Sequence, residues 1–357
     1  MVKIKDIFKQ MVEKNASDLF LQTGTCIRMR IYSQVLPADD YKLKLEDINR
    51  IVEDLTNPGQ REQFKTKLDL DFAVYYEDLG RFRVSIFMQR NSPALVVRRI
   101  RKDIQSFEEL NLPAKALEKL SLERRGIVLL TGSAGSGKST TIASMIEHIN
   151  NNANKHLLTV EEPIEFTFDS KKSITDQREL GLDVHSYESA LKHFTYQSPD
   201  VIFIGNIRDL ETMSASITAA EMGVLVLSTL HTVNAAQTVE RIINFFPPYQ
   251  HEEVRTQLSL LLKGVISLRL IPRKDQEGNI PAYEVMLLTP TIARLIREGK
   301  IWEIPAFIEQ GQIFGMQSFK QSLVNLVKEG KIDTEVARNF ADSVDEFDLE
   351  LKGIKRL

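Results

Sequence analysis

IVLLTGSAGSGKSTTIASMI, residues 127–146, decides the fold. Four apolar residues typical of a buried strand lead into a glycine-rich turn, and a stretch of helical length follows. Residues 132–139 fit G-x-x-x-x-G-K-S, a loop in which backbone N–H groups and a helix start hold phosphate. Lys138 is expected to reach the β- and γ-phosphates, and the Ser139 hydroxyl to ligate Mg²⁺. The residues expected to bind nucleotide are Ser133, Ala134, Gly135, Ser136, Gly137, Lys138, Ser139 and Thr140.

Three polar clusters further along the chain each follow a strand-like apolar segment. They are TVEEPIEF at 159–166, VIFIGNIRD at 201–209 and STLHTVNAAQT at 228–238. In open α/β sheets, ligands bind beyond the carboxyl ends of the strands. The clusters are therefore expected to lie near the phosphates.

Two of these clusters carry ionisable candidates. Pro163 ends any regular strand, so Glu161, Glu162 and Glu165 are expected on a loop beside the phosphates; a solvated acidic loop is the alternative. His231 directly follows an apolar strand, where it is placed to sense or contact a γ-phosphate. A purely structural histidine is the alternative there.

The surrounding pattern predicts an α/β nucleotide-binding core at 126–290, in which short apolar strands alternate with helix-length amphipathic stretches, as in a parallel sheet covered on both faces. An antiparallel strand pair, GVISLRLIP and AYEVMLL, is expected near its end, and 291–357 is expected to be helical. Residues 1–100 mix strand-like and helical segments, which predicts a small α+β domain. The polar, proline-interrupted segment 101–125 is expected to be a linker.

The composition of the 357-residue chain restricts the class of protein. With 43% hydrophobic and 27% charged residues it can bury cores, and two globular domains fit better than one. No apolar run reaches the roughly 18 residues needed to cross a bilayer, so a soluble protein is expected. The single cysteine, Cys26, excludes an internal disulfide and a multi-cysteine zinc site, and it points to a reducing cytosol. A net charge of −3 argues against duplex DNA, so no nucleic acid partner is expected.

The first fifteen residues, MVKIKDIFKQMVEKN, place apolar side chains on one helical stripe with lysines between them. This amphipathic helix is expected to pack on its own domain. Lying on a membrane surface is the alternative.

The motifs together resemble the Walker A, Asp-box, Walker B and His-box segments of the secretion ATPase superfamily. The resemblance is strongest to the type IV pilus retraction ATPases of the PilT/PilU family, and it runs almost end to end. Segments that carry it include ASDLFLQTG, GRFRVSIFMQRN, VVRRI, RIINFFP, TPTIARLIREGK and GMQSFKQSL. MVEKNASDLF, RIINFFP and the tail ADSVDEFDLELK are more similar to the PilU branch.

The resemblance implies a cytoplasmic homohexameric ring, peripherally associated with the inner-membrane pilus base, that uses ATP and Mg²⁺ to drive pilus retraction, seen as twitching motility. Each protomer would pair a PAS-like N-terminal domain with a RecA-like P-loop NTPase core followed by helices, with ATP bound between the two domains. The implied partners are a related retraction ATPase paralogue and the platform protein of the pilus in the inner membrane.

Further site residues follow from matching the family's motifs position by position. Glu165 takes the place of the glutamate that orients or deprotonates the attacking water, and His231 that of the His-box histidine. Arg81, Arg83 and Arg98 lie in the segments that supply phosphate-facing arginines. Because phosphoryl transfer spreads negative charge over the equatorial oxygens, an arginine brought in by domain closure would stabilise the transition state. A solvated strand face is the alternative for Arg81 and Arg83.

Three positions depart from the family pattern. Asn206 stands where a glutamate is usual, which removes a proton acceptor and a negative charge near Mg²⁺. Glu162 stands where the Asp-box usually has aspartate, and Ala293 where PilT-like chains carry an arginine. The sequence therefore predicts good ATP binding with weakened hydrolysis, unless Glu165 alone suffices as the base.

Three other functions remain to be compared with a motor ATPase. One is a hydrolysis-impaired accessory subunit that acts with an active paralogue. Pilus assembly and type II secretion ATPases usually carry a four-cysteine zinc element, which one cysteine cannot supply. A RecA-like helicase is disfavoured by the net negative charge.

Overall fold

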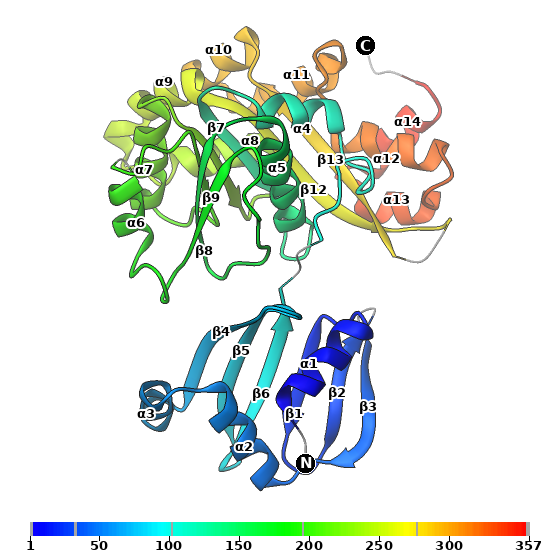
Figure 1. Ribbon diagram of the computed structural model, residues 1–357. Helices are drawn as coiled ribbons and strands as arrows, with labels where there is room; N and C mark the ends of the chain where they lie inside the picture. The colour runs from blue at the N-terminus through cyan, green and yellow to red at the C-terminus, as the bar shows by residue number, and fades with distance from the viewer. Residues whose placement is uncertain (1–2, 32–33, 101–102, 195, 276–277, 355–357) are drawn as a thin grey trace. The chain divides into compact units, whose positions relative to one another are not determined.

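Two units, each built on its own β-sheet, make up the chain (Figure 1). The computed structural model describes residues 3–31, 34–100, 103–194, 196–275 and 278–354. One unit is Met1–Asp103 with Glu165–Thr167, and the other is Ile104–Ile164 with Phe168–Leu357.

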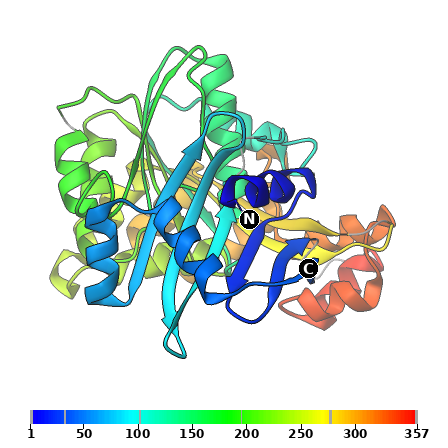
Figure 2. The same cartoon turned by 60° about the horizontal axis from the view of Figure 1, so that its bottom comes forward.

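The first unit is a six-stranded antiparallel sheet with strand order β3-β2-β1-β6-β5-β4. Its helices α1 and α2 lie against the same face of the sheet (Figure 1, Figure 2). In β5, Phe82, Val84 and Ile86 are fully buried and the residues between them are half-buried, because alternate side chains of a strand point to opposite faces. The elements are α1 (Ile4–Glu13), β1 (Asp18–Gln22), β2 (Cys26–Ile31), β3 (Gln34–Lys42), α2 (Leu45–Leu55), α3 (Pro58–Lys67), β4 (Asp69–Tyr76), β5 (Gly80–Gln89) and β6 (Ser92–Arg99).

The apolar stripe of α1 packs into the core of this unit. Ile4, Ile7, Phe8 and Met11 are buried there, and the ring of Phe8 stacks on Phe82 with centroids 4.4 Å apart. The expected packing of this helix on its own domain is confirmed.

The second unit contains a seven-stranded sheet with strand order β13-β12-β7-β11-β10-β8-β9. Strands β12, β7, β11, β10, β8 and β9 run parallel to one another, and β13 is antiparallel to β12. The expected α/β core is confirmed, and the antiparallel pair extends its sheet. The strands are β7 (Gly126–Thr131), β8 (His156–Glu161), β9 (Ile174–Glu179), β10 (Val201–Ile204), β11 (Leu225–Leu230), β12 (Leu262–Pro272) and β13 (Asn279–Leu287).

Helices flank this sheet, and those at the end of the chain gather beside β12 and β13 (Figure 1). Phe319, Leu323 and Phe347 of these last helices form a separate small core with Ile271 and Ile280 of the two strands. The α-helices are α4 (Ala114–Ser121), α5 (Lys138–Asn152), α6 (Tyr187–Phe194), α7 (Leu210–Glu221), α8 (Ala235–Ile243), α9 (His251–Leu261), α10 (Pro290–Glu298), α11 (Ile304–Gln310), α12 (Phe319–Lys328), α13 (Thr334–Phe340) and α14 (Val344–Leu351). Short 3-10 turns are η1 (Pro248–Gln250), η2 (Ile301–Glu303) and η3 (Gly311–Phe314).

Most of the segment expected to be a linker, 101–125, packs into the second unit. Phe107 and Leu112 are buried, and α4 buries Ala116, Leu117 and Leu120 on one face. These apolar residues are separated by charged ones, so the local composition is polar although a helical stripe is present. From Ile104 on, this segment therefore belongs to the second unit and contributes to its core.

In the described part of the chain, no helix combines the length and the apolar character needed to cross a membrane.

Candidate functional site

The glycine-rich loop between β7 and α5 has a backbone that only glycine fits at several points. Gly132, Gly135 and Gly137 have φ values of 144°, 77° and 96°, in the left-handed region. A Cβ at Gly132 would lie 2.5 Å from the carbonyl oxygen of Leu268 and 2.5 Å from Oγ of Ser136. At Gly132 the loop therefore packs directly on β12, with no room for a side chain.

Lys138 is the first residue of α5, and its side chain turns back over this loop. Its Nζ donates hydrogen bonds of 2.8 Å to the carbonyl oxygens of Gly132 and Ser133, and the residue is 8% exposed. A cavity of about 410 Å³ lies beside the loop, lined by residues 132–136 and by side chains of β12. The ammonium group and the start of a 15-residue helix concentrate positive charge at one place, which suits a chain of phosphates.

The other predicted nucleotide-binding residues lie on the loop or in the first turn of α5. Ser133, Ala134 and Gly135 are exposed, whereas Ser139 and Thr140 are half-buried. The hydroxyl of Ser139 is the expected Mg²⁺ ligand, and this role stays a prediction.

The ends of β8, β10 and β11 lie at the same edge of the sheet as the end of β7, because these four neighbouring strands are parallel. The segments that follow them carry Glu162, Asn206 and His231. The structure thus brings three of the predicted residues to the edge where the phosphate loop begins.

Asn206 is buried directly after β10. It is 9% exposed, and within the described residues its Oδ1 has no hydrogen-bond partner. It lines a cavity of about 430 Å³ together with Arg208, His231 and Arg241. A buried acceptor without a donor is uncommon in native proteins, so this oxygen is suited to a donor entering the cavity.

His231 follows β11 and lies close to the phosphate loop. Burial lowers the pKa of its imidazole, the positive charges of Lys138 and Arg208 lower it further, and a hydrogen bond with the backbone of Gly132 opposes them. The neutral imidazole is therefore favoured near neutral pH. His231 therefore lies within electrostatic range of Lys138 and contacts the backbone of Gly132.

Arg208 is a member of the site that the sequence reasoning missed. Its Nη1 lies 3.0 Å from Oε2 of Glu162, which ties the segment after β10 to the segment after β8. The hydroxyl of Tyr187 is buried nearby: burial raises the pKa of Tyr187 to about 12, and the carboxylate of Glu162 adds to the rise. The position of Arg208, two residues after Asn206 in the same polar cluster, is the signal that could have found it.

Glu161, the last residue of β8, is a buried acid at this edge. It is 6% exposed, and its Oε1 accepts hydrogen bonds from Oγ1 of Thr159 at 2.7 Å and from Nε2 of Gln177 at 3.2 Å. Its carboxylate is therefore held within the sheet by β8 and β9, whereas it was expected on a loop.

The remaining predicted residues belong to the first unit. Glu165 is exposed and lies in the short segment that groups with that unit. Arg81 and Arg83 alternate with buried residues of β5, and Arg98 of β6 is paired with Arg83 in the sheet register. The roles of Glu165 and of these arginines stay predictions.

Arg98 is held in place by a buried acid. Its Nε lies 2.9 Å from Oδ1 of Asp18, and the side chain of Asp18 is 7% exposed while that of Arg98 is 64% exposed. The guanidinium of Arg98 is therefore held through its Nε by Asp18, while most of the side chain is exposed.

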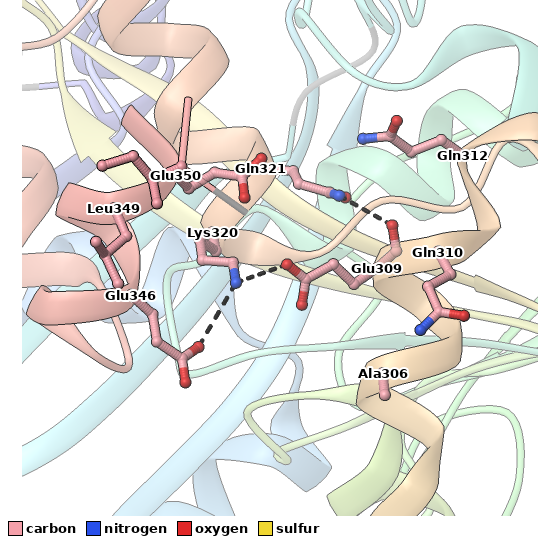
Figure 3. A pocket seen from close by; sticks show the side chains of 10 residues that line it. Ala306, Glu309, Gln310, Gln312, Lys320, Gln321, Glu346, Leu349 and Glu350 are labelled. Atoms are coloured by element: carbon pink, nitrogen blue, oxygen red, sulfur yellow. Dashed lines mark hydrogen bonds and ion pairs between the residues drawn. The ribbon is translucent and has the colours of Figure 1, made fainter. Parts of the chain in front are cut away.

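A separate cavity of about 350 Å³ lies among the C-terminal helices. Figure 3 shows Lys320 of α12 pointing between Glu309 of α11 and Glu346 of α14, with Nζ to carboxylate distances of 2.6 and 3.5 Å. None of the predicted site residues lines it.

Known proteins resemble this chain over almost its entire length. The family model described as type II/IV secretion system protein matches residues 1–304. The type IV pilus ATPase PilU of Pseudomonas aeruginosa is 41% identical, covering 98% of this chain and 92% of that protein. The PilT retraction ATPase of the same species is 38% identical, covering 96% of this chain and 99% of that protein. A crystal structure of the pilus retraction motor PilT with bound ADP matches with a TM-score of 0.91 at 39% identity, over 97% of this chain and 99% of that one.

Proposed function

We propose a motor function from one premise: the chain belongs to the family of type II/IV secretion system proteins. It is a P-loop ATPase of the type IV pilus retraction group, since PilU and PilT resemble it over nearly its whole length. The observation that carries the proposal is the phosphate loop under Lys138, at the sheet edge that also carries Asn206 and His231. The function that we propose for this ATPase is the retraction of pili.

The triphosphate of ATP binds along the loop, where the start of α5 and Lys138 offer N–H donors and positive charge. Lys138 exchanges its bonds to the carbonyl oxygens of the loop for phosphate oxygens. The neutral imidazole of His231, close to Lys138, can hydrogen-bond the terminal phosphate. The ADP in the related PilT structure supports a nucleotide ligand.

The residues present also fit Mg²⁺. The Ser139 hydroxyl would be its protein ligand, and the unpartnered Oδ1 of Asn206 would accept a hydrogen bond from a water of its shell. When bound, the ion neutralises phosphate charge during transfer.

Hydrolysis is slow in this proposal because Asn206 cannot accept a proton. Glu165 is left to orient or deprotonate the attacking water. Loss of a general base typically lowers the rate by about 10²- to 10⁴-fold.

Steady-state turnover of wild type and of Asn206→Glu tests this step. We expect kcat of Asn206→Glu to rise at least about tenfold with little change in nucleotide affinity. Asn244→Glu adds the same carboxylate elsewhere in the same cavity and is the matched control. If restoring glutamate gives no rise in kcat, or if the control rises equally, the weakened site is disproved.

The finer parts of the proposal concern assembly. We propose a homohexamer in which Arg81, Arg83 or Arg98 faces phosphate, at the cytoplasmic face of the inner-membrane pilus base, with the pilus platform protein and a paralogue as partners. The exposed guanidinium of Arg98, fixed by Asp18, supports a role in contacting an anion. Mass photometry with and without nucleotide tests the ring, and a particle that stays monomeric contradicts it.

A second candidate function is a hydrolysis-impaired subunit that reinforces an active paralogue. Asn206 favours it, as does Ala293 on α10, where related retraction motors carry an arginine. Turnover measured alone and in a mixture with the paralogue separates the two. An accessory subunit adds no turnover of its own, whereas a motor does.

A further inference from the structure

Three polar side chains form one row across the sheet beside the phosphate loop. Thr131 of β7 is opposite Ser267 of β12, which is opposite Glu284 of β13. Directly paired residues of neighbouring strands point to the same face. Thr131 and Ser267 are fully buried and Glu284 is 7% exposed.

Polar contacts link the members of the row. Oγ1 of Thr131 donates to Oγ of Ser267 at 2.9 Å. Ser267 is directly opposite Glu284, and its hydroxyl favours the ionised form of the Glu284 carboxyl group. Oε1 of Glu284 accepts a 2.7 Å bond from the backbone N–H of Ala235.

The two ends of this row belong to the two nucleotide-contacting segments. Thr131 directly precedes Gly132, whose carbonyl holds Lys138. Ala235 opens α8, directly after the segment that begins with His231. The row therefore connects the phosphate loop to the start of α8.

Burying a carboxylate is unfavourable unless hydrogen bonds satisfy it. If the position only had to fill the core, an apolar residue would serve, as at other buried positions of β13. The acid here accepts the first N–H of α8, so a shift of this helix start would leave a buried carboxylate without its donor.

We propose that Glu284 is a positioning residue that couples the phosphate loop to the His231 segment, so that nucleotide bound at the loop orders that segment. The inference rests on the proposed ATPase function.

The test compares two substitutions at one position. Glu284→Ala removes the acceptor of the Ala235 N–H and the polar contact with Ser267, and Glu284→Gln keeps an acceptor for the Ala235 N–H. Hydrogen–deuterium exchange of the full chain is measured with and without Mg-ADP. In wild type and Glu284→Gln, ADP slows exchange in residues 132–142 and in 231–240; in Glu284→Ala it slows exchange in 132–142 only.

A kinetic measurement adds a readout that a merely structural role would not produce. In the Asn206→Glu background, we expect Glu284→Ala to lower kcat about tenfold while KM for ATP changes less than about twofold. Glu284→Gln restores most of kcat. A parallel change of kcat and KM overturns the positioning role.

Control variants distinguish a failure of this inference from a failure of the proposed ATPase function. Ser216→Ala removes a buried hydroxyl of α7 outside the row and has to leave both protections unchanged. If Glu284→Ala does not fold, Thr131→Val replaces it in the test. Thr131→Val removes the hydrogen bond to Ser267 at the other end of the row, and it has to abolish the ADP-dependent slowing of exchange at residues 231–240. Protection of both segments in Glu284→Ala or in Thr131→Val overturns the inference, whereas ADP that protects neither segment in wild type overturns the proposed function as well.

Discussion

At the scale of single residues, Glu284 makes stability depend on pH. Burial raises the pKa of its carboxyl from 4.5 to about 7, although Ala235, Arg269 and Ser267 favour the ionised form. Because folding raises this pKa, the carboxyl contributes stability that is fully present below pH 4.5 and is lost as pH rises through about 7. Glu284→Gln has no proton to lose, so wild type is expected to lose up to about 3 kcal/mol relative to it across that window. Thermal midpoints of both proteins at several pH values measure this, and parallel curves would contradict it.

Gly132 gives a second prediction at this scale. In Gly132→Ala the new Cβ meets the Leu268 carbonyl and the Ser136 hydroxyl, so the loop has to move off β12. We expect ADP binding to weaken at least about tenfold, because the N–H groups of the loop lose their arrangement. Gly223→Ala is the matched control, since its φ of 102° is equally left-handed but no atom lies within 4 Å of its Cβ. Calorimetry with ADP compares them, and equal affinities would refute the packing argument.

The spacing of the loop residues was enough to predict the phosphate loop, because its chemistry is local. Glu162, Asn206 and His231 could be placed at the same edge because each follows an apolar strand of a parallel sheet. Arg208 had a local sign in its position two residues after Asn206, but its pairing with Glu162 and the contacts of Glu284 join segments distant in sequence, which sequence patterns do not show. A lone acid in the apolar strand AYEVMLL was the only local sign of Glu284.

At the scale of elements, the strands that are hardest to predict from sequence patterns are those without a buried face. β3 is mostly exposed and contains Pro37 and two aspartates, so no apolar alternation marks it. It forms because β2 offers it an edge for antiparallel pairing. The packing of helix α4 into the second unit was missed for a different reason, because its buried stripe lies between lysines and glutamates that make the segment polar on average.

Lys320 gives the prediction at this scale, because it joins three helices through Glu309 and Glu346 (Figure 3). Lys320→Met keeps the apolar stem but leaves the two carboxylates without their shared cation. We expect α14 to loosen by about 1 kcal/mol, a modest value since both acids are partly exposed. Hydrogen exchange of residues 344–354 measures this, with Lys328→Met on the same helix as the control. Unchanged exchange would show that apolar packing of Phe347 alone holds α14.

At the scale of the whole molecule, a ring of coupled protomers makes a prediction that independent protomers do not. Lys138→Ala protomers lack the ammonium at the phosphate loop, so they are expected to assemble but not to hydrolyse ATP. We expect that adding increasing amounts of Lys138→Ala protomers to Asn206→Glu protomers lowers total turnover more steeply than in proportion to the fraction of active chains. The reason is that each inactive protomer blocks its neighbours in the ring. Adding Lys328→Met chains in the Asn206→Glu background controls for dilution and subunit exchange, and should leave turnover per chain unchanged. A decline in simple proportion, with exchange between rings verified by mass photometry, would mean that the sites fire independently, and the coupling of the proposed motor would then have to be abandoned.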